Sequence, residues 1–236
     1  HQKAVGKGIH ISHHAAHQIA AGMGVQIGKG QFLQFPAHLV PQVLANGESD
    51  EARDYGYGFL QGANQAAMNF NRYTAIRYDY GQKDASRSDI RKKAKKWYDE
   101  GALAVFTYGA DVFDGVKAEA EKAEKKVIAS NASKDYTETV ITSAKKCYEE
   151  AAVSQLEAVY GGSFRGGKAV TMNAKNKGIG LDMKKSKFQN FNEDLYGDIY
   201  KKIASGEQEI LSPKDAKTID DLVKAQWMYY IRIEQE

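Results

Sequence analysis

The sequence has 236 residues, of which 42% are hydrophobic and 27% are charged, and its formal net charge is +3. These values are typical of a globular protein with one large domain or two smaller lobes. No apolar run in the sequence approaches about 18 residues, which excludes a transmembrane helix. The single cysteine, Cys147, excludes an internal disulfide and a four-cysteine zinc site. Acidic residues interrupt the basic stretches, so we expect no nucleic-acid partner, and the densest basic stretch, 91–100, predicts a solvated helix face.

Strand and helix patterns alternate along the chain from residue 72 onward. Short runs rich in β-branched, aromatic and apolar residues predict strands, and longer stretches with helical spacing of apolar residues predict helices. A further short strand, a glycine-rich turn and two helices follow in the last third, and the second of these helices is expected to close the chain at 218–236. The predicted strands are 72–81, 103–108, 126–130 and 139–143, and the helices between and after them are 86–101, 111–125 and 144–162.

Strands that alternate with helices in this way predict an α/β fold with a parallel sheet. In such open sheets, ligands bind beyond the carboxyl ends of the strands. Tyr108 and Asp111 follow one predicted strand, and Asn131 and Ser133 follow the next one. We therefore expect these four side chains to lie on the same rim of the sheet.

Each of these residues has a ligand-binding interpretation and a structural one. Tyr108 offers a face for stacking and a hydroxyl for hydrogen bonding, or it packs under the next helix. Asp111 accepts hydrogen bonds from a ligand or caps the following helix, and capping is the favoured alternative. Asn131 and Ser133 bind ligand hydroxyls or form an Asx-type turn, and ligand binding is favoured.

Four histidines lie close together in the segment "HISHHAAH". On a helix, His10, His13, His14 and His17 share one face, and histidines four residues apart can chelate zinc. No acidic residue or cysteine among them completes a structural site. We therefore predict no metal site and expect surface or hinge histidines that titrate near neutral pH.

Several segments in order resemble the basic membrane protein family, the purine nucleoside receptor A-like substrate-binding proteins of bacterial ABC transporters. The segment "YGYGFLQGANQA" (55–66) resembles the family's helix with a paired G-F-x-x-G pattern. The segment 76–106 is similar to its strand, acidic turn, helix and strand. "VITSAKKCYEEAAVSQLEAVYGGSFRGGK" (140–168) resembles its "V-L-T-S-x-x-K" stretch and long helix, and "KKIASGEQEILSP" (201–213) resembles its closing "I-x-S-G-x-x-x-V-P".

The resemblance implies a type I periplasmic-binding fold, with two α/β lobes, parallel sheets flanked by helices, and a ligand between the lobes. The family's first segment has no counterpart, so we expect one lobe to be incomplete in this chain, whether as a fragment or a divergent member. Residues 1–30 are expected to be a remnant of lobe one and the hinge. Residues 31–136 would form lobe two, and 137–236 would return to lobe one, the hinge and the C-terminal helices.

The resemblance also assigns roles to three residues. It places Phe113 in the loop whose aromatic residue stacks on a base, although a core position on the first helical turn is an equal alternative. Asn131, in "ASNASK" (129–134), stands where the family has an aspartate that typically holds a ribose. Lys146 aligns with the lysine of "V-L-T-S-x-x-K", which implies contact with a ribose hydroxyl or a phosphate.

The function that follows is that of a receptor: a substrate-binding protein that holds a small polar heterocycle, such as a purine nucleoside, and delivers it to an ABC permease. We expect no enzymatic activity and no cofactor. The resemblance implies a position outside the cytoplasm, with a lipid anchor that needs a cysteine upstream of His1. The alternatives are a regulatory or interaction protein on the same fold, a receptor for another ligand such as a flavin, and an α/β enzyme acting on a nucleotide. For the enzyme, the sequence offers no catalytic constellation.

Overall fold

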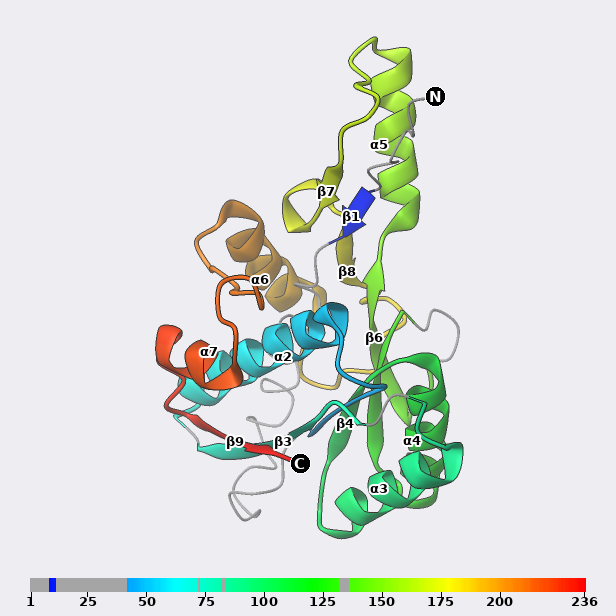
Figure 1. The fold of residues 1–236 in the computed structure, drawn as a ribbon, viewed down its shortest axis with the longest axis vertical. Helices are drawn as coiled ribbons and strands as arrows, with labels where there is room; N and C mark the ends of the chain where they lie inside the picture. Colours follow the sequence, from blue (N-terminus) through cyan, green and yellow to red (C-terminus); the bar gives the residue numbers. More distant parts are fainter. Residues whose placement is uncertain (1–8, 12–41, 72, 82–83, 132–135) are drawn as a thin grey trace.

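A computed structural model of the chain describes residues 9–11, 42–71, 73–81, 84–131 and 136–236 (Figure 1). These residues form a seven-stranded sheet with the order β8-β6-β5-β4-β2-β3-β9 and a two-stranded sheet of β1 and β7. All neighbours in both sheets are parallel except β6 and β8. The strands are β1 (Ile9–Ile11), β2 (Gln42–Ala45), β3 (Thr74–Asp79), β4 (Ala104–Tyr108), β5 (Lys126–Ser130), β6 (Val140–Lys146), β7 (Val170–Met172), β8 (Ile179–Leu181) and β9 (Ile231–Gln235).

Helices cover both faces of the large sheet. The helix α2 lies on one face together with α7, whereas α3 and α4 lie side by side on the other (Figure 1). The helix α5 continues from β6 away from this sheet, toward β7 and β1 (Figure 1). The helices are α2 (Asp50–Asn69), α3 (Arg87–Asp99), α4 (Ala110–Lys122), α5 (Tyr148–Tyr160), α6 (Glu193–Ser205), α7 (Ile219–Ala225) and the 3₁₀ turn η2 (Ala174–Asn176).

Local sequence signals explain where most helices begin. The Ser49 hydroxyl accepts a hydrogen bond from the Ala52 amide at 3.1 Å and caps α2. The Ser86 hydroxyl accepts from the Asp89 amide at 3.2 Å and caps α3. Such caps satisfy amide donors that have no partner within the helix. The alternating strands and helices predicted over 72–162 are confirmed by these elements, except that residues 144–146, expected in a helix, extend β6.

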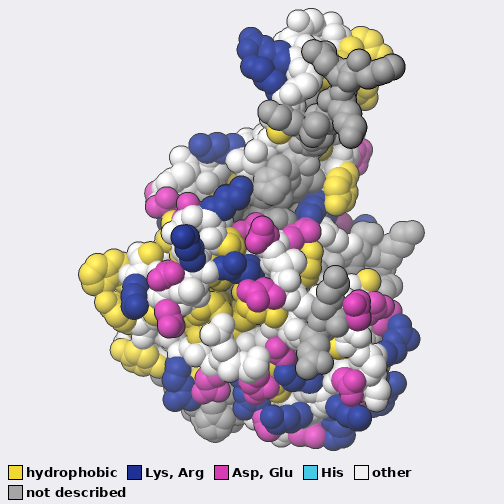
Figure 2. Space-filling model, in the orientation of Figure 1, with side chains coloured by type: hydrophobic (Ala, Val, Ile, Leu, Met, Phe, Trp, Pro, Cys, Tyr) yellow, Lys and Arg dark blue, Asp and Glu magenta, His cyan; other side chains and the backbone are white. Residues whose placement is uncertain are grey.

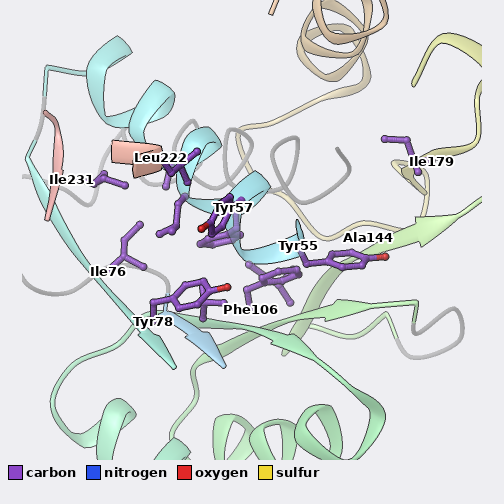
Figure 3. Packing of buried hydrophobic residues seen from close by; sticks show 14 of the residues in the cluster. Tyr55, Tyr57, Ile76, Tyr78, Phe106, Ala144, Ile179, Leu222 and Ile231 are labelled. Atoms are coloured by element: carbon purple, nitrogen blue, oxygen red, sulfur yellow. The ribbon is translucent and has the colours of Figure 1, made fainter. Parts of the chain in front are cut away.

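Two apolar cores hold the helices to the sheet, one on each face. The core under α2 contains aromatic side chains from the helix and from β3 and β4, including Tyr55, Tyr78 and Phe106 (Figure 3). In this core the rings of Phe59 and Phe106 stack with centroids 5.0 Å apart. The opposite core is built from α3, α4 and the other face of the strands, with Trp97 fully buried in it. Burial on both faces explains why the central strands read as apolar runs.

The prediction of one helix over 218–236 is wrong. The helix α7 ends at Ala225, and the chain continues as β9, which pairs in parallel with β3. Trp227 has a φ of 50°, a left-handed conformation that a regular helix does not contain. The apolar residues of this segment also fit a strand. Pairing with β3 satisfies the backbone hydrogen bonds of the segment, and the local sequence pattern does not reveal this long-range partner.

The boundary expected at residue 137 falls between two strands of the same sheet. Both β6 and β9 come after it, and both join the sheet that contains β2 to β5. The division into lobe one and lobe two therefore stays a prediction. Among the residues that the structure describes, no helix is long and apolar enough to cross a membrane.

Asp54 is a half-buried carboxylate on α2, and burial raises its pKa from 3.8 to about 6. Because the folded protein favours the protonated form, this group stabilises the fold most at low pH. Its contribution is lost as pH rises from 3.8 through about 6. We expect the free energy of unfolding to fall over this window by about 1 kcal/mol, after allowance for partial solvent screening.

The measurement is chemical denaturation at a series of pH values for the protein and for Asp54→Asn. The amide does not titrate, so the variant should show a smaller fall in stability across the window and should be the more stable form at pH 7. An identical pH dependence in the two proteins would show that folding does not raise the pKa of Asp54.

Candidate ligand-binding site

The site lies where the connections of the large sheet change face. The strand β2 is paired with both β3 and β4, and Ala45 lies opposite Tyr108 in the register of β2 and β4. After β2 the chain enters α2 on one face, and after β4 it enters α4 on the other (Figure 1). In open parallel sheets, ligands bind at such a topological switch point, beyond the carboxyl ends of the strands.

Backbone interactions hold the two strand ends together at this point. The Asn46 amide donates to the Tyr108 carbonyl at 3.0 Å. Gly109 follows with a φ of 105°, which side-chain-bearing residues rarely adopt. A Cβ at Gly109 would also lie 2.9 Å from the Asn46 Cβ. Glycine is therefore required where the chain turns from β4 into α4.

Five polar or aromatic side chains converge beside this turn, and we refer to them as the rim cluster. They come from α2, β4, β6 and the residue after β5. The Tyr55 and Tyr108 rings lie 5.2 Å apart, and the Asn131 Nδ2 donates to the Tyr55 hydroxyl at 3.4 Å. The Lys146 ammonium forms an ion pair with Glu51. The members of the rim cluster are Glu51, Tyr55, Tyr108, Asn131 and Lys146.

Asn131 links β5 to β6 through both its backbone and its side chain. The backbone N–H of Asn131 donates to the Ala144 carbonyl at 2.6 Å, and its side-chain Oδ1 accepts from the backbone N–H of Lys146 at 3.1 Å. Its φ of 55° is left-handed, a conformation that asparagine adopts more easily than most residues. These bonds tie Asn131 to β6, and neither is the side-chain bond of an Asx-type turn, so the choice between a turn and ligand binding stays a prediction. The same geometry brings the side-chain amide of Asn131 to the rim cluster.

Burial and the neighbouring carboxylate keep the two tyrosines of the rim cluster neutral. Burial raises the pKa of Tyr108, and the hydrogen bond and negative charge of Glu51 raise that pKa further. Burial and the charge of Glu51 also raise the pKa of Tyr55, although its hydrogen bond from Asn131 lowers it. Both hydroxyls therefore keep their proton at neutral pH.

The lysine and the glutamate compensate each other's charge. The Lys146 side chain is 15% exposed, and that of Glu51 is 38% exposed. An ammonium group has three N–H donors, and one of them serves Glu51. The rim cluster joins two tyrosine hydroxyls, an amide, an ammonium and a carboxylate through contacts with one another, while the Tyr55 ring is buried in the core. Groups of these kinds can exchange hydrogen bonds with a polar ligand.

Two residues predicted for the site, Phe113 and Asp111, do not join the rim cluster, and a third cannot be placed. Phe113 is 6% exposed and lies in the core between the sheet and α3 and α4, which is its structural alternative. Asp111 is exposed in the first turn of α4 and does not cap it, because Gly109 is the N-cap and no side chain bonds there. Its charge still suits a helix amino end. Ser133 lies outside the described residues.

Sequence reasoning missed Glu51 and Tyr55. They lie four residues apart on α2, so both project from one face of its first turns. The available signal was Ser49, a typical N-cap residue directly before the acidic pair at 50–51 and an aromatic-rich helix. That signal places the helix start, but nothing in it indicates that this start faces the ends of β4, β5 and β6.

The histidine segment lies mostly outside the described residues. His10 lies in β1, a strand, so the helical arrangement considered for it does not apply. His13, His14 and His17 are among the residues that the structure does not describe, and their role stays a prediction. Within the described part of the chain, no group of three or more histidine, cysteine or acidic side chains could hold a metal ion.

A protein-family model described as ABC transporter substrate-binding protein PnrA-like matches residues 28–214 of the chain. No curated protein matches the chain.

Three solved structures are similar to the fold. A solute-binding protein of an ABC transporter system from Aeropyrum pernix K1 has a TM-score of 0.71 and 17% identity, over 92% of this chain and 70% of that one. A solute-binding protein from Conexibacter woesei DSM 14684 has a TM-score of 0.61 and 17% identity, over 86% of this chain and 64% of that one. A transcriptional activator of the comK gene from Bacillus halodurans has a TM-score of 0.56 and 14% identity, over 87% of this chain and 66% of that one.

At these identities, the likeness shows the fold alone. Together with the mostly parallel sheet flanked by helices, it confirms the predicted α/β fold of the type I periplasmic-binding kind. The chain spans 64% to 70% of the length of these three structures.

Proposed function

Because the chain belongs to the family of PnrA-like ABC transporter substrate-binding proteins, we propose that it binds a small polar heterocycle, such as a purine nucleoside, at the rim cluster. The protein acts as a receptor and performs no chemistry on the ligand. Its partner is a permease in the membrane, and it works outside the cytoplasm, attached by a lipid. Closure of a second lobe over the rim buries the ligand and signals its presence to the permease.

The observation that supports this proposal is the convergence of four elements on one point at the switch of the sheet. Asn131 directly follows β5, Tyr108 ends β4 and Lys146 ends β6, and all three lie near the start of α2. Pockets at such positions combine apolar walls with a few polar groups that fix the orientation of a ligand.

Each side chain has a distinct role in this proposal. Tyr108 stacks on the heterocycle, and base-aromatic stacking contributes about 1–3 kcal/mol in nucleic-acid systems. Asn131 exchanges hydrogen bonds with sugar hydroxyls, more weakly than a carboxylate in that place would. Lys146 donates to a hydroxyl or a phosphate oxygen.

A regulatory protein on the same fold is the second candidate, and one observation favours it. The ammonium of Lys146 is already paired with Glu51, so ligand binding has to compete with an ion pair inside the protein. A flavin is a further possible ligand, because it too is a planar heterocycle with hydroxyl groups on its side chain.

The first experiment is native mass spectrometry of the purified chain, with identification of any small molecule released on denaturation. A stoichiometric heterocycle would support the receptor proposal and name the ligand class. An empty protein that also shows no thermal shift with nucleosides or flavins would move the assignment to the regulatory candidate.

We expect Lys146→Met to weaken binding of an identified ligand about tenfold, because the variant keeps the aliphatic length but removes a charged donor. Calorimetric titration with that ligand measures the change. Lys145→Met is the matched control: successive residues of a strand point to opposite faces, so Lys145 faces away from the rim cluster. Equal losses in the two variants would contradict the assignment of Lys146, and thermal melting shows that both variants are folded.

A further inference from the structure

The strand β9 forms an edge of the large sheet. It is the last strand in the order, and within the described part of the chain it pairs with β3 alone. Figure 1 places it at the side of the molecule, beyond β3 and below α7. An exposed edge offers unpaired backbone groups to another strand, so proteins usually protect it or use it.

The hydrogen bonds to β3 show which residues of β9 face outward. The Tyr230 carbonyl accepts from the Thr74 amide at 3.0 Å, and the Glu236 amide donates to the Tyr78 carbonyl at 3.2 Å. Because backbone groups alternate between the two sides of a strand, residues 232 and 234 also face β3. The N–H and C=O groups of Ile231, Ile233 and Gln235 are therefore directed away from β3, to the side on which no described strand pairs with β9.

The side chains of this edge are complementary to themselves under two-fold symmetry. In an antiparallel pair of β9 strands centred on Ile233, residue 232 of one copy lies directly opposite residue 234 of the other. These residues are Arg232 and Glu234, with side chains 73% and 38% exposed. Within one copy, Arg232 and Glu234 form an ion pair with each other, and in the antiparallel pair these contacts are exchanged for two cross-strand ion pairs.

The backbone and charge patterns agree on the same register. Ile233 would oppose itself as a hydrogen-bonded pair, which requires its backbone groups to face outward, as they do. The charged residues then occupy the non-hydrogen-bonded positions, where opposing Cα atoms are about 4.5 Å apart and side chains are closest. If the register of the two strands shifted by one residue, residues whose backbone groups face the other copy would lie opposite residues whose groups face β3, and the hydrogen bonds would not form.

The surface beside the edge also suits a protein contact. Hydrophobic side chains gather on the side of the molecule where α7 and the start of β9 lie (Figure 2). A groove of about 360 Å³ lies there, with Tyr73, Tyr229 and Tyr230 in its wall. In the register above, Gln235 of a second copy lies opposite Ile231, at this groove. Exposed aromatic patches of this kind are typical of interaction sites.

We propose that two copies of this chain associate through β9, in an antiparallel pair centred on Ile233 that joins their two sheets. This proposal does not depend on the identity of the ligand, because β9 lies on the far side of β2 and β3 from Lys146 and Asn131. Strand addition at an edge is a general mode of protein recognition.

Sedimentation velocity over a wide range of protein concentrations tests the proposal. We expect a species of twice the 26.1 kDa of the chain. Arg232→Glu should weaken its dimer at least about tenfold, because both cross-strand pairs become repulsive, and Glu234→Arg should do the same. The double variant Arg232→Glu/Glu234→Arg should recover the dimer. An equimolar mixture of the two single variants should also recover it, because opposite charges then face each other in the mixed pair.

Arg87→Glu is the control, because Arg87 is also an exposed arginine and lies on α3. It should leave the dimer unchanged, and thermal melting confirms that all variants fold. A monomer at every concentration would overturn the proposal. So would a dimer that is insensitive to the charges at 232 and 234, or single variants whose mixture stays monomeric.

Discussion

Replacing Trp97 by alanine should lower the free energy of unfolding by about 3–5 kcal/mol. The Trp97 side chain is fully buried between α3 and the sheet. Its Nε1 donates to the Glu236 carboxylate at 3.2 Å, and the Lys93 ammonium lies 5.7 Å from the ring centroid. Truncation therefore removes a large apolar contact, leaves a cavity and takes a donor from a carboxylate at the end of the chain.

The other tryptophan of the chain provides the matched control. Trp227 is 69% exposed, and its replacement by alanine should change stability by no more than about 0.5 kcal/mol. Chemical denaturation followed by circular dichroism measures both variants at the same protein concentration. Similar losses in the two variants would contradict the placement of Trp97 in the core.

Replacing Gly56 by alanine should destabilise the protein by about 1–3 kcal/mol. Gly56 lies inside α2, where alanine normally favours the helix. A Cβ at this position would, however, overlap the ring and hydroxyl of Tyr78, which is 1% exposed on β3. The close approach of α2 to the sheet thus depends on the absence of a side chain here, and a clash would shift the helix that carries Glu51 and Tyr55.

A glycine-to-alanine substitution in another helix should raise the free energy of unfolding instead of lowering it. Gly197 lies in α6, and a Cβ there would have no atom within 4 Å. Gly197→Ala should therefore stabilise the protein by about 0.5–1 kcal/mol through its helix preference. Denaturation curves of the two variants give the comparison, and a stabilised Gly56→Ala would show that α2 does not lie this close to Tyr78.

Much of the fold was predictable because its signals are local. Apolar runs that end on small or polar residues predicted β4 and β5, and helical spacing of apolar residues predicted α3 and α4. The resemblance of ordered segments to a family of substrate-binding proteins was confirmed by the match over residues 28–214. A repeated order of strand and helix is sufficient to indicate a parallel sheet, since parallel strands need crossovers.

The candidate site was predictable only in part. Tyr108 and Asn131 follow predicted strands, and the rule for open sheets brings such ends together without further information. Lys146 was assigned only through the family resemblance, because its segment was expected to be helical, whereas it ends β6. Glu51 and Tyr55 come from a helix, and which face of a helix meets the rim depends on how it packs. Phe113 shows the same limit in reverse, because an aromatic residue in the first turn of α4 faces either the ligand side or the core.

The sequence by itself determined the α/β class, the order of most elements and the carboxyl rim where polar residues gather. Those properties follow from periodicity, capping and chain order, which act over a few residues. Only the tertiary structure decided that residues 231–235 form a strand, that Glu51 pairs with Lys146, and that Gly56 admits no side chain. Each of these features depends on a contact between segments far apart in the sequence. The local sequence pattern is compatible with more than one conformation at these positions, and packing against the distant segment selects one of them.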